Sequence, residues 1–160
     1  MKKLLTTIAV CLTAVMAMAA DSTTPPVFQM RLVAESPSAN SEQLICQSTN
    51  QETGRVSVEK LYVQKKVLLD QAALKSVVAT RSRQSHWQID FSLTPEGTKQ
   101  FAEITGQNVG KRLAIVIDGR LITAPTIQSS ITGGQGQITG NFSKQEAKDL
   151  AAKLNQAARK

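Results

Sequence analysis

The stretch "RLAIVIDGRLITA", residues 112–124, constrains the fold more than any other part of the sequence. Its first half is apolar at consecutive positions, which is typical of a central strand buried on both faces. Asp118-Gly119 is a two-residue hairpin signal, so we expect 120–124 to return beside this strand. The chain therefore needs apolar layers on both sides of a sheet.

Other segments add strands to this hairpin. Alternating apolar residues predict strands at 27–34 and 56–64, and a hairpin of 77–83 with 86–93 around a turn at 83–85. In the second arm Trp87, Ile89, Phe91 and Leu93 point to one face, and His86, Gln88, Asp90 and Ser92 point to solvent. We expect a further strand that includes Ile127 and Ile131, and another at 136–139. The polar stretch 35–57 is predicted to be a long loop with a short ordered piece at 44–46.

Two helices are signalled by their caps. Thr94-Pro95-Glu96 predicts the start of the first helix, and Gly110 its stop. Ser143 and Glu146 form a capping box for the second, whose apolar stripe comprises Ala147, Leu150, Ala151, Leu154 and Ala158. One or two helical turns are expected at 69–76, capped by Asp70. The predicted fold class is α+β, a mainly antiparallel sheet packed against two principal helices.

The N-terminus is typical of an export signal. Lys2 and Lys3 precede an apolar run, and Ala17-Met18-Ala19 offers a signal-peptidase site. We therefore expect residues 1–19 to be removed after Ala19, leaving one exported, periplasmic domain at 20–160 with a flexible lead-in at 20–26. A lipoprotein cleaved at Cys11 is disfavoured because the cut would divide the apolar run.

Charge and cysteine content narrow the function. Loss of Lys2 and Lys3 lowers the net charge from +7 to +5, and the remaining basic residues are spread along the chain. Nucleic-acid binding is therefore not expected, and membrane association is expected to be peripheral at most. Cys46 has two open interpretations, a small buried hydrophobe or a reactive thiol.

The glycine-rich stretch 131–140 does not match a nucleotide site. Gly134, Gly136 and Gly140 are spaced one residue too widely for a dinucleotide loop, and no lysine follows as in a Walker loop. We instead predict a turn at Gly133-Gly134 and another at Gly140-Asn141, which leads into the second helix. No cofactor is expected.

Catalytic and metal signatures are missing from the sequence. His86 is the only histidine and has no partners at metal-ligand spacing. His86 with Asp90 is the one acid–base pair worth testing, as a hydrolase hypothesis. We predict no catalytic residues, no metal and no enzyme activity.

Several motifs together carry a family resemblance. They are Thr94-Pro95-Glu96-Gly97, Asn108 to Val116, Asp118-Gly119, Ala124-Pro125, and Ile131 to Gly134 running on to Phe142. Over 91–154 the sequence closely resembles the head part of the first periplasmic domain of SecD and SecDF, accessory membrane subunits of the Sec protein-export machinery. A weaker similarity extends upstream. In one departure, Gln135 stands where the family often carries arginine.

The resemblance implies an α+β head that holds or releases exported polypeptide, without the family's membrane helices. The expected function is a non-catalytic binding module for unfolded or newly exported polypeptide, or for Sec translocon components. The alternative is an envelope structural or adaptor domain that kept the fold without an export role. An edge strand and accessible backbone between 124 and 140 suggest the contact residues Pro125, Ile127, Gln128, Ser129, Ser130, Gly133, Gly134 and Gln135.

Overall fold

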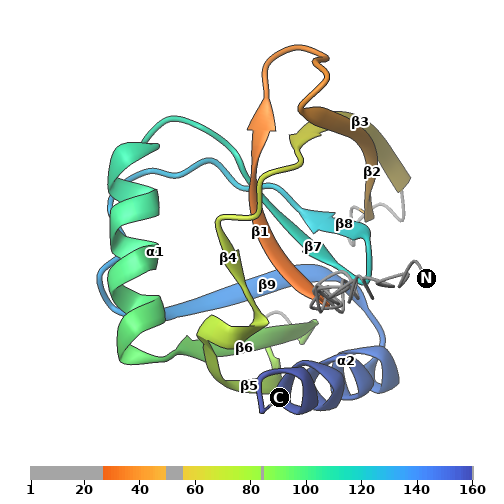
Figure 1. Ribbon diagram of the computed structural model, residues 1–160. Coiled ribbons are helices and arrows are strands. Elements are labelled where there is room, and N and C mark those ends of the chain that lie inside the picture. The colour runs from red at the N-terminus through yellow and green to blue at the C-terminus, as the bar shows by residue number, and fades with distance from the viewer. Residues whose placement is uncertain (1–26, 50–55, 84, 160) are drawn as a thin grey trace, which may run out of the picture.

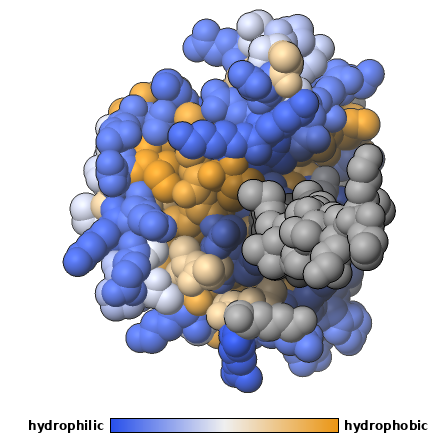
Figure 2. All heavy atoms as spheres, in the orientation of Figure 1, coloured by the Kyte–Doolittle hydropathy of each residue, from blue (hydrophilic) through white to orange (hydrophobic). Residues whose placement is uncertain are grey.

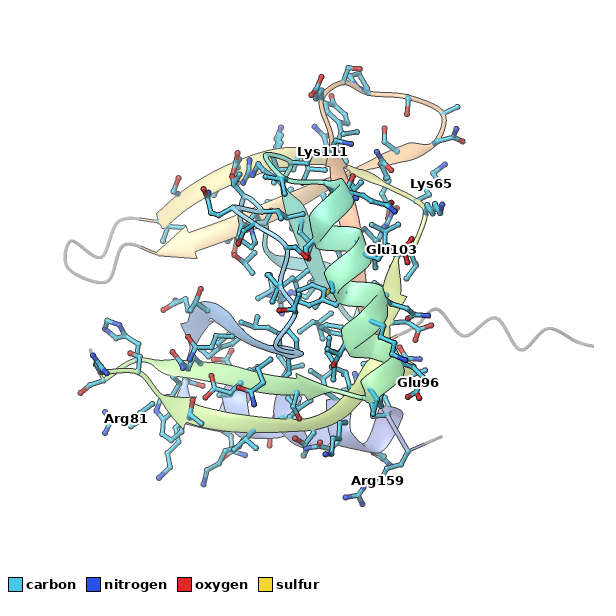
Figure 3. The ribbon with its side chains drawn as sticks, turned by 90° about the vertical axis from the view of Figure 1, so that its left-hand side faces the viewer. Lys65, Arg81, Glu96, Glu103, Lys111 and Arg159 are labelled. Atoms are coloured by element: carbon cyan, nitrogen blue, oxygen red, sulfur yellow. The ribbon has the colours of Figure 1, made fainter. Side chains whose placement is uncertain are left out.

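The computed structural model describes residues 27–49, 56–83 and 85–159. The predicted signal peptide and lead-in lie outside these residues. Two sheets lie one above the other, with helix α1 (Pro95–Gln107) along one side and helix α2 (Lys144–Ala157) against the lower sheet (Figures 1 and 3). The fold is therefore α+β with mainly antiparallel strands, as predicted. No helix in the described ranges is long and apolar enough to cross a membrane.

The larger sheet has the strand order β2-β3-β1-β7-β8, with the short β4 beside β1. Its strands are β1 (Phe28–Ala34), β2 (Ser41–Thr49), β3 (Val56–Gln64), β4 (Leu69–Asp70), β7 (Leu113–Ile117) and β8 (Arg120–Thr123). The β7–β8 hairpin turns at Asp118 and Gly119, whose φ angles of 50° and 74° are both positive. Such a turn matches the twist of the flanking strands, which explains the Asp-Gly signal.

The smaller sheet has the order β5-β6-β9. Its strands are β5 (Leu74–Arg81), β6 (Trp87–Leu93) and β9 (Gln135–Phe142). β5 and β6 form the predicted antiparallel hairpin, and β9 pairs with the other side of β6. Asn155 of α2 joins the edge of this sheet, because its side chain accepts from Val77 N at 2.9 Å and donates to Val77 O at 2.7 Å.

The helix starts agree with the caps in the sequence. Thr94 accepts a hydrogen bond from Gly97 N at 3.0 Å, and Pro95 occupies the first turn of α1. Ser143 and Glu146 form a reciprocal capping box at α2. Asp70 caps a short 3₁₀ turn, η1 (Gln71–Ala73), in place of a longer helix.

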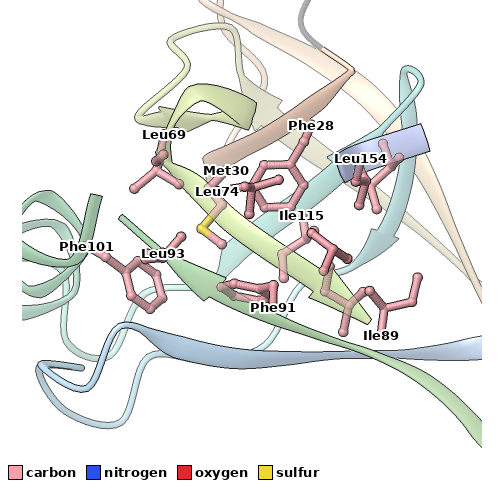
Figure 4. Packing of buried hydrophobic residues seen from close by; sticks show 14 of the residues in the cluster. Phe28, Met30, Leu69, Leu74, Ile89, Phe91, Leu93, Phe101, Ile115 and Leu154 are labelled. Carbon is pink, nitrogen blue, oxygen red and sulfur yellow. The ribbon is translucent and has the colours of Figure 1, made fainter. Parts of the chain in front are cut away.

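β7 separates two apolar clusters. Leu113, Ile115 and Ile117 face the main core, which fills the space between the sheets and contacts α1 and α2 (Figure 4). Ala114 and Val116 face a second, smaller cluster, to which β2, β3 and β8 also contribute side chains. The two faces of one strand thus serve two cores, as the consecutive apolar residues predict. Each fully buried large side chain contributes about 1.5–3 kcal/mol.

The region predicted as a long polar loop contains a full strand. β2 pairs with β3 from Ser41 opposite Gln64 to Thr49 opposite Val56. Leu44 and Cys46 pack against the second cluster, whereas the neighbouring Gln43, Ile45 and Gln47 lie on the other face. Polar residues dominate the strand because only part of one face is buried, and this hid it from the sequence pattern.

Three further expectations are corrected. The expected strand through Ile127 and Ile131 is absent from the described residues, because segment 124–134 bonds to the turn after α1, the start of β7, α1 and the end of β6, with one isolated bridge at Thr126. Gly140 and Asn141 lie in β9 as a bulge, since Trp87 pairs with Phe142 while Gln88 pairs with Thr139. Gln88 is buried and not solvated, because β6 is the central strand of its sheet and is flanked on both sides.

Candidate functional site

The loop 124–134 contains most of the predicted contact residues and is fixed to the start of β7. Pro125 O accepts from Leu113 N at 2.9 Å, and Ile127 N donates to Lys111 O at 2.9 Å. Ile127 O in turn accepts from Gly110 N at 2.8 Å. The positive φ of Gly110, 85°, lets the chain reverse after α1 and present this amide. The first half of the loop therefore has a defined backbone path.

The second half of the loop is fixed to α1 and β6. Ser130 Oγ donates to Ala102 O at 2.9 Å, and Ile131 N donates to Thr105 Oγ1 at 2.9 Å. Thr105 is fully buried and its hydroxyl donates to Phe101 O at 2.7 Å, so it satisfies a backbone group on each side. The loop thus runs along α1 with hydrogen bonds at several points (Figure 1).

Gly134 ends the loop at a close contact with α1. Its φ is +63°, and a Cβ at this position would lie 2.1 Å from Thr98 Oγ1. Its carbonyl accepts from Leu93 N at 2.8 Å. Positive φ and close approach both require glycine here, so the Gly133-Gly134 turn has a structural cause.

The predicted contact residues divide into exposed and buried sets. Six are exposed: Pro125, Gln128, Ser129, Ser130, Gly133 and Gln135. Ile127 and Gly134 are buried, so the Ile127 side chain and the Gly134 backbone fix the loop and do not reach a partner. Sequence reasoning missed Ile131 and Val109, which are 38% and 53% exposed. An isoleucine within a polar loop was the available signal for the first.

The backbone of the loop is less accessible than a free edge strand. The carbonyls of Pro125 and Ile127 and the amide of Ile127 are already bonded within the domain. Thr126 forms a single isolated bridge with Arg112. The expected edge-strand pairing is therefore not available at 125–127, and contact there falls to exposed side chains.

One ion pair braces the beginning of the loop. Arg112 Nη1 and Nη2 bond Glu59 Oε1 and Oε2 at 2.6 and 2.9 Å, and Arg112 Nε donates to Ala124 O at 3.0 Å. These hydrogen bonds from Arg112 lower the pKa of the Glu59 carboxyl. Nearby, burial raises the pKa of the Cys46 thiol, the Glu59 carboxylate raises it further, and Arg112 opposes the shift. A raised pKa favours the unreactive thiol form of Cys46.

His86 and Asp90 are not brought together. His86 is exposed just before β6. It is four residue steps from Asp90 along extended backbone, which places the two Cα atoms roughly 13 Å apart. Asp90 instead accepts from Thr80 Oγ1 at 2.7 Å and Gln88 Nε2 at 2.9 Å. In the described ranges no three His, Cys, Asp or Glu side chains gather as a metal site would need. The hydrolase hypothesis therefore has no assembled pair to rest on.

The face that carries α1 and β4 is apolar at its centre and hydrophilic around it (Figure 2). A hollow of about 430 Å³ lies there between residues 67–73 and the first turns of α1, lined partly by Val67, Leu68 and Leu69. Glu96 and Glu103 project from the outer side of α1, and Lys111 lies at its far end (Figure 3). Charges of both signs therefore surround α1 and give it no single electrostatic preference.

Fold and site together define a small α+β domain of two antiparallel sheets, with a hydrogen-bonded loop displayed along one helix. The sequence model of the SecDF P1 head subdomain matches residues 42–158. The chain belongs to this family, as the motifs indicate, and the match extends well upstream of residue 91.

The relatives are much longer than this chain. SecD of Leptotrichia buccalis is 46% identical over 92 residues, which are 58% of this chain and 23% of that protein. SecDF of Thermus thermophilus is 55% identical over 67 residues, 42% of this chain and 9% of that protein. The chain thus spans less than a quarter of either relative's length.

Solved structures show the same fold. A SecDF described as a membrane component that enhances protein export superimposes with a TM-score of 0.63 at 33% identity, over 81% of this chain and 61% of that one. SecDF in a super-membrane-facing form gives a TM-score of 0.62 at 34% identity, over 81% of this chain and 18% of that one.

Proposed function

We propose that this chain acts in protein export as a non-catalytic module that contacts exported polypeptide or Sec translocon components. The support is membership of the SecDF P1 head family, together with relatives that are protein translocase subunits. We further propose that it works in the periplasm, after cleavage of the signal peptide following Ala19.

The contact would use what we term the loop surface. It comprises the exposed residues Pro125, Gln128, Ser129, Ser130, Ile131, Gly133 and Gln135. The observation that carries this assignment is a backbone held by hydrogen bonds from Pro125 to Gly134 beneath exposed side chains. Binding to such a surface costs little ordering entropy, because the loop is already fixed before a partner arrives.

The chemistry of the loop surface suits a partner of variable sequence. It has no charged side chain, so it excludes neither acidic nor basic segments by repulsion. Gln128 and Ser129 offer both donors and acceptors to a peptide backbone, and Ile131 adds one exposed apolar contact. These are the requirements of a surface that meets many different chains weakly.

The test is photocrosslinking in cells that make the full chain with its own N-terminus. A benzophenone side chain replaces Gln128 on the loop surface, or in a matched control Gln137, an exposed glutamine of β9. We expect Sec subunits or many exported proteins to be captured at 128 and not at 137. Capture of one folded envelope protein at 128 would instead support the adaptor alternative. Equal capture at both positions would refute the loop surface.

A further inference from the structure

A groove of about 930 Å³ lies on the side of the domain away from the loop surface. Terminal strands of both sheets line it: β2 and β8, at the two ends of the larger sheet's order, and the last residues of β9. Residues 146–153 of α2 close the lower side. In Figure 1 these elements surround the right-hand part of the molecule.

The strands that line the groove leave backbone groups without ladder partners. β2 pairs only with β3, β8 with β7, and β9 with β6. Within the described residues no backbone hydrogen bond joins β2, β8 and β9 to one another. β2 and β8 nevertheless lie close to each other, and Cys46 Sγ donates to Ile122 O at 3.6 Å. An unpaired edge is the usual template for an added extended strand, and because these edges lie close together a segment can pair with one of them at a time.

The wall formed by β2 and β3 carries exposed apolar side chains beside two glutamines, Gln43 and Gln47. Ile45 and Val56 line the groove and are 51% and 62% exposed. Ile45 and Thr49 are four residues apart in β2 and therefore share a face. Val56 of β3 lies opposite Thr49, as Lys60 lies opposite Ile45, so Ile45 and Val56 lie on the same face. Phe142 and Leu150 line the groove from β9 and α2. An extended segment with apolar side chains at alternate positions fits between such walls.

Charge at the groove is opposite in sign to that of the whole chain. Asp118, Glu146 and Asp149 line it with Arg120 and Lys153, three carboxylates against two cations, whereas the chain carries +7. Lys153 is already paired with Asp118 at 2.6 Å. Asp149 accepts a hydrogen bond from the neutral Gln145 at 2.8 Å. A cationic side chain in the occupant would therefore be attracted to Asp149.

We propose that the groove binds an extended polypeptide segment that carries alternating apolar residues and at least one lysine or arginine. The segment would lie along one free strand edge, with its apolar side chains against Ile45 and Phe142 and its cation near Asp149. This rests on the proposed function in that the partner is a polypeptide. It uses residues that the loop surface does not contain.

The test is fluorescence anisotropy with the full chain and a labelled decapeptide that alternates valine with threonine and contains one lysine. We expect Ile45→Lys to weaken binding at least tenfold. The matched control Val78→Lys changes an equally exposed residue (54%) of β5 that does not line the groove, and should leave binding within twofold. Replacing the peptide lysine with glutamate, or methylating alternate backbone amides, should also weaken binding several-fold.

Three results would overturn the groove assignment. They are unchanged binding by Ile45→Lys, an equal loss with Val78→Lys, and full binding of the N-methylated peptide. A dimer in analytical ultracentrifugation that Ile45→Lys dissolves would identify a second copy of the chain as the occupant and also overturn it. Crosslinking through position 128 in the Ile45→Lys variant separates the two proposals, since it reports the loop surface whatever happens at the groove.

Discussion

Replacing Gly134 with alanine should destabilise the domain far more than the same change at the adjacent Gly133. An alanine at 134 must keep a φ of +63°, which costs about 1–2 kcal/mol for a residue with a Cβ. Its Cβ would also lie 2.1 Å from Thr98 Oγ1 and 3.1 Å from Thr98 Cβ, so the loop or α1 must shift. We expect a total loss of about 2–4 kcal/mol.

Gly133 is the matched control because an added Cβ there meets nothing within 4 Å and its φ is not positive. Gly133→Ala should stay within about 0.5 kcal/mol of the parent, or stabilise slightly through the unfolded state. The assay is urea unfolding followed by the fluorescence of Trp87.

A double-mutant cycle isolates the steric part of the loss. Thr98→Ala removes the two nearest atoms, so it should recover about 1 kcal/mol when combined with Gly134→Ala. The part of the stability loss that comes from the positive φ at position 134 should remain. Equal losses for the two glycine variants, or no coupling with Thr98, would refute this account of the loop.

Three other predictions test neighbouring features. Thr105→Val should cost about 1–2 kcal/mol and speed amide exchange at Ile131, whose N–H loses its acceptor; unchanged exchange would contradict the anchoring role. Hydrogen bonds from Ser143 lower the pKa of the Glu146 carboxyl in the folded chain. The carboxylate therefore contributes its full share to the free energy of unfolding above the pKa of Glu146 in the unfolded chain, and this share is lost as the pH falls through the lower pKa of the folded chain. In urea titrations the gap in unfolding free energy between Glu146→Gln and the parent should therefore narrow below pH 4.5. Because burial raises its pKa, Cys46 should react with iodoacetamide more slowly in the folded chain than in urea at about pH 8.

Local signals in the sequence predicted the parts of the fold that depend on local physics. The Asp118-Gly119 hairpin and the cap at Thr94 each rest on hydrogen bonds or backbone angles within a few residues, so residue type at fixed spacing reveals them. β2 was missed because its pairing with β3 and its partial burial against the second cluster are set by distant residues. Ile127 looked like a strand residue because it is apolar. In the structure it is buried in a loop whose backbone bonds to the turn after α1.

The candidate surfaces were predicted to different degrees for the same reason. The loop surface lies in one continuous segment, so its exposed polar residues could be proposed from composition, although the buried Gly134 could not be separated from Gly133. The groove has no such segment. Ile45, Arg120, Phe142 and Asp149 converge from four elements, and no spacing in the sequence relates them. A surface built from strand edges becomes visible only when the order of the strands is known.

The central strand β7 connects the two surfaces mechanically. Leu113, at its start, donates to Pro125 O in the loop, and Ile117, at its end, lines the groove. Leu113 and Ile117 are four residue steps apart, roughly 13 Å between Cα atoms, and all five side chains of β7 are buried between two packed clusters. Such an element does not deform gradually, so the loop surface and the groove keep a fixed spacing. If both proposed contacts exist, a single extended polypeptide of sufficient length would engage both, and two weak contacts on one chain would hold it more strongly than either does separately. Under the two proposals, release of that chain would then require loss of only one contact at a time.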